Sequence, residues 1–165
     1  MTRFHATCAA AMVLVFTVCS RAAEPVLATD LLRVKEIIDV AIARDASFAI
    51  FSVRSIAEPR SSGEDSRYTY EDHLWMVDLR APNSRPVQLT FNDHQDTAPA
   101  ISPDGSKLAF VRLENRPGAL PQIWLMPLSQ PGEAREITNL EFGAVDPRWQ
   151  PDGRSLLVSS AIPLS

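Results

Sequence analysis

The sequence is poor in cysteine and glycine, with two cysteines and six glycines among 165 residues. Both cysteines, Cys8 and Cys19, lie near the N-terminus. If that segment is removed, the remaining chain has no disulfide, no reactive thiol and no cysteine-based metal site. Thirteen prolines stand against the six glycines, and this balance favours many turns and few long helices.

An excess of basic residues is also absent. Lysine and arginine together number 16 against 20 aspartates and glutamates, which gives a net charge of −4. This balance attracts neither a nucleic acid nor an anionic membrane surface, so we expect no nucleic-acid partner. Hydrophobic residues make up 45% of the chain and charged residues 22%, which is the composition of a globular protein that can bury a core.

Residues 1–22 have the three parts of a secretory signal peptide. Met1–His5 is a short basic start, Ala6–Val18 is apolar and uncharged, and Cys19–Ala23 is rich in small residues. We predict cleavage after Ala22. The apolar run is too short to span a bilayer comfortably. Cleavage removes two arginines and no acidic residue, so the net charge becomes −6.

We therefore expect an exported protein, periplasmic or extracellular, with no transmembrane anchor after cleavage. Two alternatives stay open for this segment. The first is an N-terminal core helix, although Ala6–Ser20 has no polar face of the kind that a surface helix needs. The second is a lipoprotein attached through Cys19, although the residue before that cysteine is Val18, where a lipoprotein signal has a small residue.

A repeat of 48 to 49 residues organises the rest of the chain. The matching blocks occur in one order: Pro99–Phe110 with Pro147–Val158, His73–Leu79 with Gln122–Leu128, and Val87–Thr90 with Arg135–Thr138. A fainter copy, Ile42–Phe51, aligns with Ile101–Phe110. It keeps the aspartate, the serine and the final phenylalanine but has lost the proline and the glycine.

Each block has the features of a β element. The Pro-Asp-Gly segments at 103–105 and 151–153 are turn sequences, in which the aspartate can bond back to nearby backbone N–H groups and the glycine accepts a left-handed conformation. Apolar residues such as Leu108 and Phe110 alternate along the flanking segments, as in strands with one buried face. The pattern predicts four short strands in each repeat.

Four antiparallel strands that recur every 40 to 50 residues or so are the blade of a β-propeller. We predict an all-β fold: an incomplete propeller of about two and a half four-stranded blades over residues 40–165. Residues 23–39 would be a leader with a short helix at Thr29–Ile38, capped by Thr29. A β-sandwich is the alternative, but it does not require a fixed long period.

The Pro-x-(Trp or Ile)-x-Pro-Asp-Gly pattern, followed by an apolar strand and Ile-Trp-Leu, resembles the TolB-type, WD-like propeller repeat. That repeat occurs in TolB and in the N-terminal propeller of the prolyl oligopeptidase family of serine peptidases, including dipeptidyl and acylaminoacyl peptidases. The resemblance covers residues 29–160, and the opening Thr29–Val34 favours the peptidase branch. It implies a propeller that lies over an α/β-hydrolase domain and restricts access to the catalytic serine.

The sequence departs from those peptidases because it lacks the Gly-x-Ser-x-Gly motif of the nucleophile. We therefore assign no catalytic, cofactor-binding or metal residue and expect no enzymatic activity from this chain. We interpret it as a truncated propeller segment of an exported serine peptidase, whose partners would be a peptide substrate or the α/β-hydrolase domain of the full-length parent. The alternatives are a TolB-like periplasmic binding propeller without enzymatic activity, and the product of a decayed reading frame.

Several polar residues are candidates for a catalytic or metal site. His94, Asp96 and the nearby Ser102 are the residue types of a catalytic triad, but Asn92–Asp96 is a polar connection between blades without an oxyanion-hole or nucleophile-elbow signal. Asp93, His94 and Asp96 are too few and too loosely spaced for a metal site. A solvated turn is the simpler interpretation of this stretch.

Three tryptophans are candidates for a carbohydrate or peptide platform. Trp75 and Trp124 hold equivalent places in the repeat, and Trp149 stands where the preceding repeat has Ile101. Equivalent places imply equivalent packing, so we favour a core role between blades for all three. The first repeat also has ten extra residues within Glu58–Asp72. This polar loop is either solvated or, in a complete protein, part of a substrate passage.

Overall fold

The computed structural model of the chain describes residues 27–57, 68–91, 93–130 and 132–163. The predicted signal peptide lies outside the described residues, and so does the greater part of the ten-residue insertion in the first repeat. In the part of the chain that is described, no helix has the length and apolar character needed to cross a membrane.

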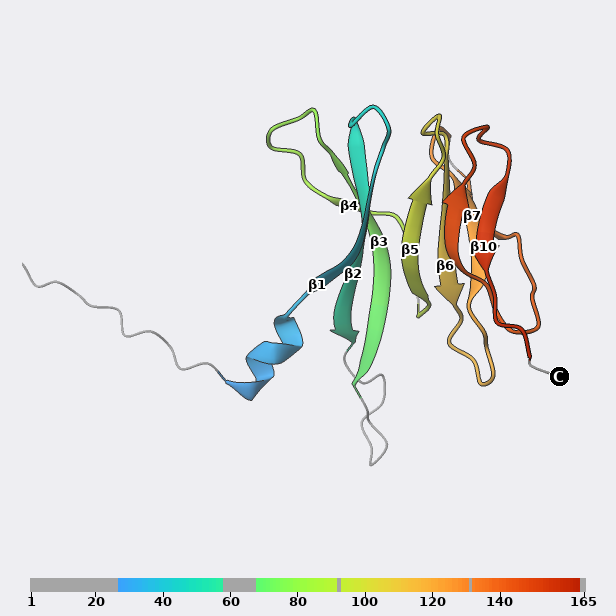
Figure 1. Ribbon diagram of the computed structural model, residues 1–165. Helices are drawn as coiled ribbons and strands as arrows, with labels where there is room; N and C mark the ends of the chain where they lie inside the picture. The colour runs from blue at the N-terminus through green and yellow to red at the C-terminus, as the bar shows by residue number, and fades with distance from the viewer. Residues whose placement is uncertain (1–26, 58–67, 92, 131, 164–165) are drawn as a thin grey trace, which may run out of the picture.

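The described residues contain one short 3₁₀ helix, η1 (Ala28–Arg33), and ten strands (Figure 1). The strands are β1 (Glu36–Ile42), β2 (Phe48–Ala57), β3 (Thr69–Asp78), β4 (Val87–Gln88), β5 (Gln95–Ile101), β6 (Lys107–Leu113), β7 (Gln122–Pro127), β8 (Arg135–Glu136), β9 (Val145–Trp149) and β10 (Leu156–Ser159). The all-β prediction is therefore confirmed.

The strands form two four-stranded antiparallel blades and one half blade. Blade 1 is β1–β4, blade 2 is β5–β8 and the half blade is β9–β10. A single parallel bridge between Asp72 on β3 and Gln95 on β5 joins the first two blades. The hairpin turns β1–β2, β5–β6 and β9–β10 lie at one end of the molecule (Figure 1). This is the partial propeller that the repeat predicts.

The strand register repeats between blades as the sequence does. Phe51 on β2 stands opposite Trp75 on β3, and Phe110 on β6 stands opposite Trp124 on β7. These pairs place the fainter first copy in the same frame as the second. Equivalent residues of the two repeats therefore stand opposite each other in equivalent strand pairs.

Two apolar clusters fill the spaces between blades. The first unites Ile50 and Leu74 of blade 1 with Leu108 and Phe110 of blade 2, and all four are fully buried. The second unites residues of blade 2 with the half blade: Ala109, Val111, Ile123 and Ala144 are its buried members, and Trp149, Leu156 and Val158 pack against them. Alternate residues of β6 enter opposite clusters because side chains alternate along a strand. Blade 2 is covered on both faces.

The predicted helix at Thr29–Ile38 is wrong in its extent and its cap. The helix ends at Arg33, and β1 begins at Glu36, ahead of the expected blade boundary at residue 40. The carboxylate of Asp30, not Thr29, accepts a hydrogen bond from the Leu27 N–H at 2.8 Å. Ile37 pairs with Val53 of β2, because β-branched residues gain more from a sheet than from a short helix.

Candidate functional site

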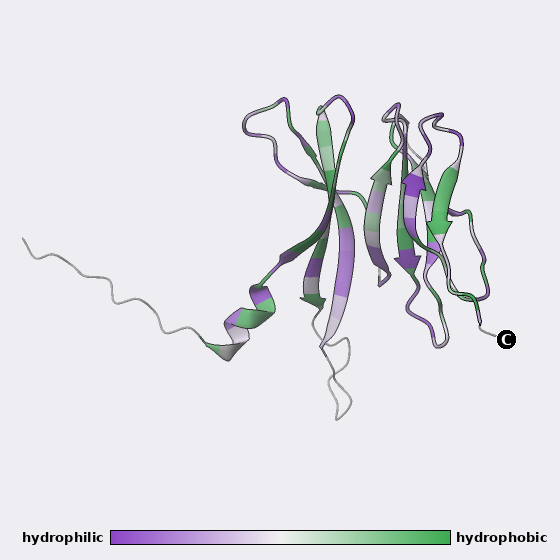
Figure 2. Ribbon diagram, viewed as in Figure 1, coloured by the Kyte–Doolittle hydropathy of each residue, from purple (hydrophilic) through white to green (hydrophobic). Residues whose placement is uncertain are grey.

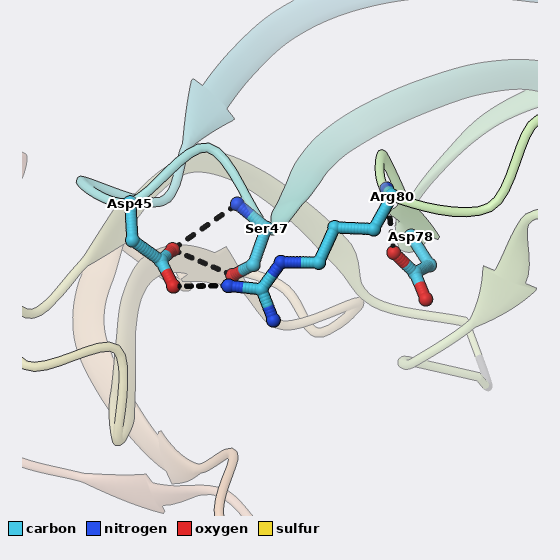
Figure 3. Close-up of polar contacts among 4 residues, drawn as sticks. All are labelled: Asp45, Ser47, Asp78 and Arg80. Atoms are coloured by element: carbon cyan, nitrogen blue, oxygen red, sulfur yellow. Dashed lines mark hydrogen bonds and ion pairs between the residues drawn. The ribbon is translucent and has the colours of Figure 1, made fainter.

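The two ends of the blades differ in chemistry, and the end with the hairpin turns is built from aspartates. Asp45, Asp104 and Asp152 stand at the same place in three successive turns, and each accepts a hydrogen bond from the backbone N–H two residues on, at 2.9 to 3.1 Å. In the first turn Asp45 also accepts from the Ser47 hydroxyl at 2.6 Å and from the Arg80 guanidinium at 2.7 Å (Figure 3). The turn chemistry expected from Pro-Asp-Gly is confirmed, including in the copy that lacks proline and glycine.

These hydrogen bonds favour the ionised carboxylates. The Ser102 and Ser106 groups around Asp104 lower its pKa from 3.8 to about 2. The Ser47 groups, with a smaller contribution from Arg80, lower the pKa of Asp45. Each turn carboxylate is therefore occupied in holding its own hairpin, which makes this end a structural element of the fold.

The residue after the turn aspartate takes the left-handed conformation in all three hairpins. Gly105 and Gly153 have φ of 72° and 65°. The first hairpin places Ala46 there with φ of 54°. The side chain of alanine clashes with the backbone in this region, whereas glycine has no such clash. The first repeat therefore keeps the turn geometry, but Ala46 lowers the free energy of unfolding relative to a glycine at this position.

The opposite end of the first two blades carries two arginine–aspartate pairs. Arg54 donates to the Asp72 carboxylate at 2.9 and 2.8 Å, and Arg112 donates to the Asp96 carboxylate at 2.7 and 2.8 Å. Both aspartates are fully buried. The side chain of Arg112 is 11% exposed and that of Arg54 38% exposed. Each carboxylate uses both oxygens on one guanidinium, so neither is placed to act as a general base.

The two ion pairs face each other across the space between blades 1 and 2. Arg54 lies four residues after Ile50 on β2, and Arg112 lies two residues after Phe110 on β6, so each shares a face with a member of the first cluster. The buried hydroxyl of Ser52 lies between Ile50 and Arg54 and has no hydrogen-bond partner among the described residues. Each ion pair joins two neighbouring strands of one blade, β2 to β3 in blade 1 and β5 to β6 in blade 2.

The repeat could not have revealed these pairs. Asp72 belongs to a third strand and Asp96 to a first strand, so the two aspartates do not occupy equivalent positions. The arginine of the second pair, Arg112, stands opposite Gln122, and Arg54 stands opposite Asp72. Arg112 also stands directly opposite Asp96, so each pair is set by the strand register within one blade.

The structure does not bring the triad candidates together. Ser102 lies just beyond the end of β5, where its hydroxyl donates to Asp104 at 2.6 Å and accepts from the Lys107 N–H at 2.9 Å. Asp96 lies at the start of the same strand, in the ion pair with Arg112. His94 precedes that strand, and its Nδ1 is buried without a hydrogen-bond partner in the described segments. Serine and aspartate are at opposite ends of β5.

The structure does not bring Asp93, His94 and Asp96 together as metal ligands either. Within residues 27–57, 68–91, 93–130 and 132–163, no three histidine, cysteine, aspartate or glutamate side chains come together as a metal site would need. Asp93 has an interaction partner of its own. The segment before β5 is a connection between blades, but the expected solvated turn is wrong for Asp96, which is fully buried on β5.

The tryptophans have three different environments. Trp124 packs against the first apolar cluster, with the Arg112 guanidinium 4.6 Å from its ring centroid. Trp149 packs into the second cluster, and its indole N–H donates to the Ala100 carbonyl at 2.9 Å. The expected role between blades is confirmed for both. Trp75 differs.

Trp75 lies between Leu74 and Met76, which face blade 2, so its ring projects from the other face of blade 1. No blade among the described residues covers that face. The Lys35 ammonium lies 5.8 Å from its ring centroid. Val40 and Ile42 of β1 share this face and are 60% and 62% exposed. Equivalent places in the repeat therefore did not give equivalent burial, because blade 1 packs against another blade on only one side within the described residues.

The geometry defines a set of β-propeller blades whose described polar side chains mainly hold the hairpin turns and join neighbouring strands of a blade. No family model matches the chain. In sequence it is 28% identical over 137 residues to the uncharacterized peptidase YuxL of Bacillus subtilis, and 28% identical over 124 residues to tricorn protease homolog 2 of Streptomyces coelicolor. The matches cover 83% and 72% of this chain but 19% and 10% of those proteins.

A solved structure has the same fold. The β-propeller domain of the Trilobed protease from Pyrococcus furiosus, described as having an open velcro topology, matches with a TM-score of 0.53 at 20% identity. The match covers 75% of this chain and 34% of that one. The chain therefore resembles the propeller of a protease and not a catalytic domain. It spans about a fifth of the first relative's length.

Proposed function

We propose that this chain is a non-catalytic propeller segment of an exported peptidase of the prolyl oligopeptidase type, and that the propeller limits which substrates reach the catalytic domain. The observation that carries the proposal is the match to a protein named as a peptidase across 83% of this chain but only 19% of that protein. In such a protein the propeller does not cleave the peptide bond itself, because a separate catalytic domain performs that reaction.

The physical basis of a size filter is rigidity. The blades are held by antiparallel ladders, by buried apolar clusters between blades and by two bidentate ion pairs. Interfaces packed to this degree transmit strain and do not deform continuously, so a folded protein is kept out while an extended peptide passes. Peptide substrates and an α/β-hydrolase domain are the partners in this scheme.

Export through residues 1–22 belongs to the same proposal. Its test is N-terminal sequencing of the protein secreted by a bacterial host, for which we expect a start near Ala23. Secreted protein that retains Met1 or Thr2 would contradict a cleaved leader.

To test whether this chain belongs to a peptidase, the coding sequence beyond Ser165 should be determined. We expect a frame, continuous or restored by one frameshift, that reaches a Gly-x-Ser-x-Gly motif. The product of that frame should cleave short peptides but not folded proteins, and deletion of residues 27–163 should open cleavage to larger substrates. Further blades followed by a stop codon would instead support a TolB-like binding propeller without enzymatic activity.

The present chain should be catalytically silent by itself. We expect no labelling by a serine-reactive fluorophosphonate and no hydrolysis of peptide or ester substrates. Stoichiometric labelling of one serine would overturn this interpretation.

A further inference from the structure

A pocket of about 280 Å³ lies between the η1 segment and the first three strands of blade 1. η1 stands at the end of β1 that is away from the hairpin turns (Figure 1), and it contacts β2. The pocket is built entirely from blade 1 and the segment before it. We call it the η1 pocket, and its lining includes Leu31, Val34, Glu36, Arg54, Ile56 and Tyr70.

Strand pairing places the charged groups of the η1 pocket in one row. Glu36 stands opposite Arg54, and Arg54 stands opposite Asp72. Residues directly opposite each other in antiparallel strands point to the same face of the sheet, so these three side chains share one face of blade 1. Asp72 is fully buried and Glu36 is exposed. The guanidinium therefore lies between a buried carboxylate and an exposed one.

The buried carboxylate occupies only two of the three guanidinium nitrogens of Arg54. Nε and Nη2 donate to Asp72 at 2.9 and 2.8 Å, and Nη1 makes no hydrogen bond with the described residues. The hydrogen bonds with Asp72 raise the pKa of Arg54, and the nearby charge of Glu36 acts in the same direction. Within the described residues Glu36 and Arg54 nevertheless form no ion pair. The pocket thus has a cationic donor and an anion that do not contact each other.

The rest of the lining is apolar. Ile56 stands opposite Tyr70 and lies two residues after Arg54, so it shares the face of the charged row. The ring centroid of Tyr70 is 5.5 Å from the guanidinium carbon of Arg54. Leu31, Val34 and Tyr70 are 63%, 59% and 59% exposed. Figure 2 shows that η1 has both hydrophobic and hydrophilic residues and that β2 ends in hydrophobic ones. An apolar group bound here would remove this surface from water.

We propose that the η1 pocket binds a free apolar α-amino acid as its zwitterion. The ligand's carboxylate accepts from Nη1 of Arg54, its ammonium donates to the carboxylate of Glu36, and its side chain packs against the apolar lining. Charge complementarity favours this class of ligand, because Glu36 repels a simple carboxylate and Arg54 repels a simple amine. Pockets for drug-sized ligands measure roughly 300–1,000 Å³, so the smaller volume here suits an amino acid.

The inference goes beyond the proposed peptidase role and holds with or without it, because every residue that it uses belongs to this chain. Charge-assisted hydrogen bonds between a guanidinium and a carboxylate are about twice as strong as neutral ones. A ligand as small as leucine still has few atoms with which to bind, so we expect a dissociation constant of about 1 mM or lower.

The test follows L-leucine binding to the full chain by ¹⁹F NMR. The sequence has two tyrosines, Tyr68 and Tyr70, so 3-fluorotyrosine gives two signals, and Tyr70→Phe assigns them. We expect the Tyr70 signal to shift and to saturate with leucine, and the Tyr68 signal to shift less, because Tyr68 does not line the pocket. The absence of a saturable shift of Tyr70 up to about 20 mM leucine, well above the expected dissociation constant, would overturn the inference.

Two leucine analogues separate the charged contacts without altering the protein. 4-Methylpentanoate lacks the amino group and 3-methylbutylamine lacks the carboxylate, while both keep the side chain of leucine. Each should bind at least about fivefold more weakly than leucine, as expected from the loss of one partly exposed ion pair. Binding of either analogue as tight as that of leucine would refute the zwitterion.

A protein variant completes the cycle. Glu36→Gln should weaken leucine binding about fivefold but should not weaken binding of 4-methylpentanoate, which has no ammonium to lose. Equal weakening of both ligands would refute the contact between Glu36 and the ammonium. Glu136→Gln is the matched control, because it removes the same charge from β8 of blade 2, and it should leave leucine binding unchanged.

A loss of leucine binding in Glu136→Gln as large as that in Glu36→Gln would show a general effect of net charge and would overturn the assignment. Both glutamates are exposed, so we expect both variants to keep the circular dichroism spectrum of the original chain. If Glu36→Gln does not fold, the analogue series on the original chain still decides the question.

Discussion

Replacement of Trp124 by alanine tests whether packing between blades holds this molecule together. The indole is half-buried against the cluster of Ile50, Leu74, Leu108 and Phe110 and lies beneath the Arg112 guanidinium. Truncation of a core tryptophan costs about 3–5 kcal/mol, and partial exposure of this ring favours the lower end of that range. Loss of the cation–π contact adds about 1 kcal/mol. We expect a total of about 3–4 kcal/mol, a large part of the ~5 kcal/mol that a marginally stable domain has.

Trp75→Ala is the matched control. Trp75 has the same place in the repeat and the same kind of cross-strand partner, Phe51, but it lies on the face of blade 1 that no described blade covers. Its removal should cost about 1 kcal/mol, the ordinary value for a partly exposed residue. The difference between the two variants therefore isolates the interface between blades from the local environment of the strand.

The assay is urea denaturation followed by circular dichroism, since each variant loses one fluorophore. Size-exclusion chromatography should show association or aggregation for Trp124→Ala and much less for Trp75→Ala, because each blade depends on its neighbours for stability. Equal losses in the two variants would refute the reasoning. A compact monomer with an unchanged cooperative melt for Trp124→Ala would favour a closed sandwich over an open set of blades.

Three further predictions test individual contacts. Asp96→Asn should destabilise the fold by about 3–5 kcal/mol in urea melts, because it leaves the largely buried Arg112 side chain without its charge partner. A loss below that of an average surface change would contradict a stabilising ion pair between β5 and β6. Ala46→Gly should raise the free energy of unfolding by about 1 kcal/mol, because glycine relieves the left-handed strain at φ of 54°, and a loss of stability would show that the alanine side chain matters more than the backbone. The pKa of Asp104 is lowered in the fold from 3.8 to about 2, so its contribution to stability is present above pH 3.8 and is lost as the pH falls towards 2. In acid titrations followed by circular dichroism, Asp104→Asn should therefore lose less stability than the original chain over this pH range. An identical pH profile for the two proteins would contradict the assignment.

The sequence by itself determined the strands and turns of each blade and the period with which the blades recur. The Pro-Asp-Gly turns, the alternation of Leu108 and Phe110 and the period of 48 residues are local or nearly local signals. Turn geometry and strand alternation depend on neighbouring residues, so they can be recognised from order along the chain. The same repeat gave the four strands of each blade and the number of blades correctly, whereas the pairing of Phe110 with Trp124 was seen only in the structure.

Residues without a periodic signal were predicted less well. The segment from Thr29 to Ile38 has an apolar pattern that suits a helix, but its last residues have a strand partner in β2. Sequence order does not show whether such a partner is within reach. Local propensity was therefore outweighed by the hydrogen bonds and burial that a sheet edge offers.

The tertiary structure alone decided which polar side chains pair across neighbouring strands and which aromatic rings a neighbouring blade covers. Arg54 and Asp72 are 18 residues apart, and Arg112 and Asp96 are 16 apart, and neither separation belongs to the repeat. Trp75 and Trp124 are equivalent in sequence, yet Trp124 faces a neighbouring blade, whereas Trp75 faces no blade of the described residues. Burial and charge pairing are properties of the space between elements, and that space exists only once the blades are placed side by side.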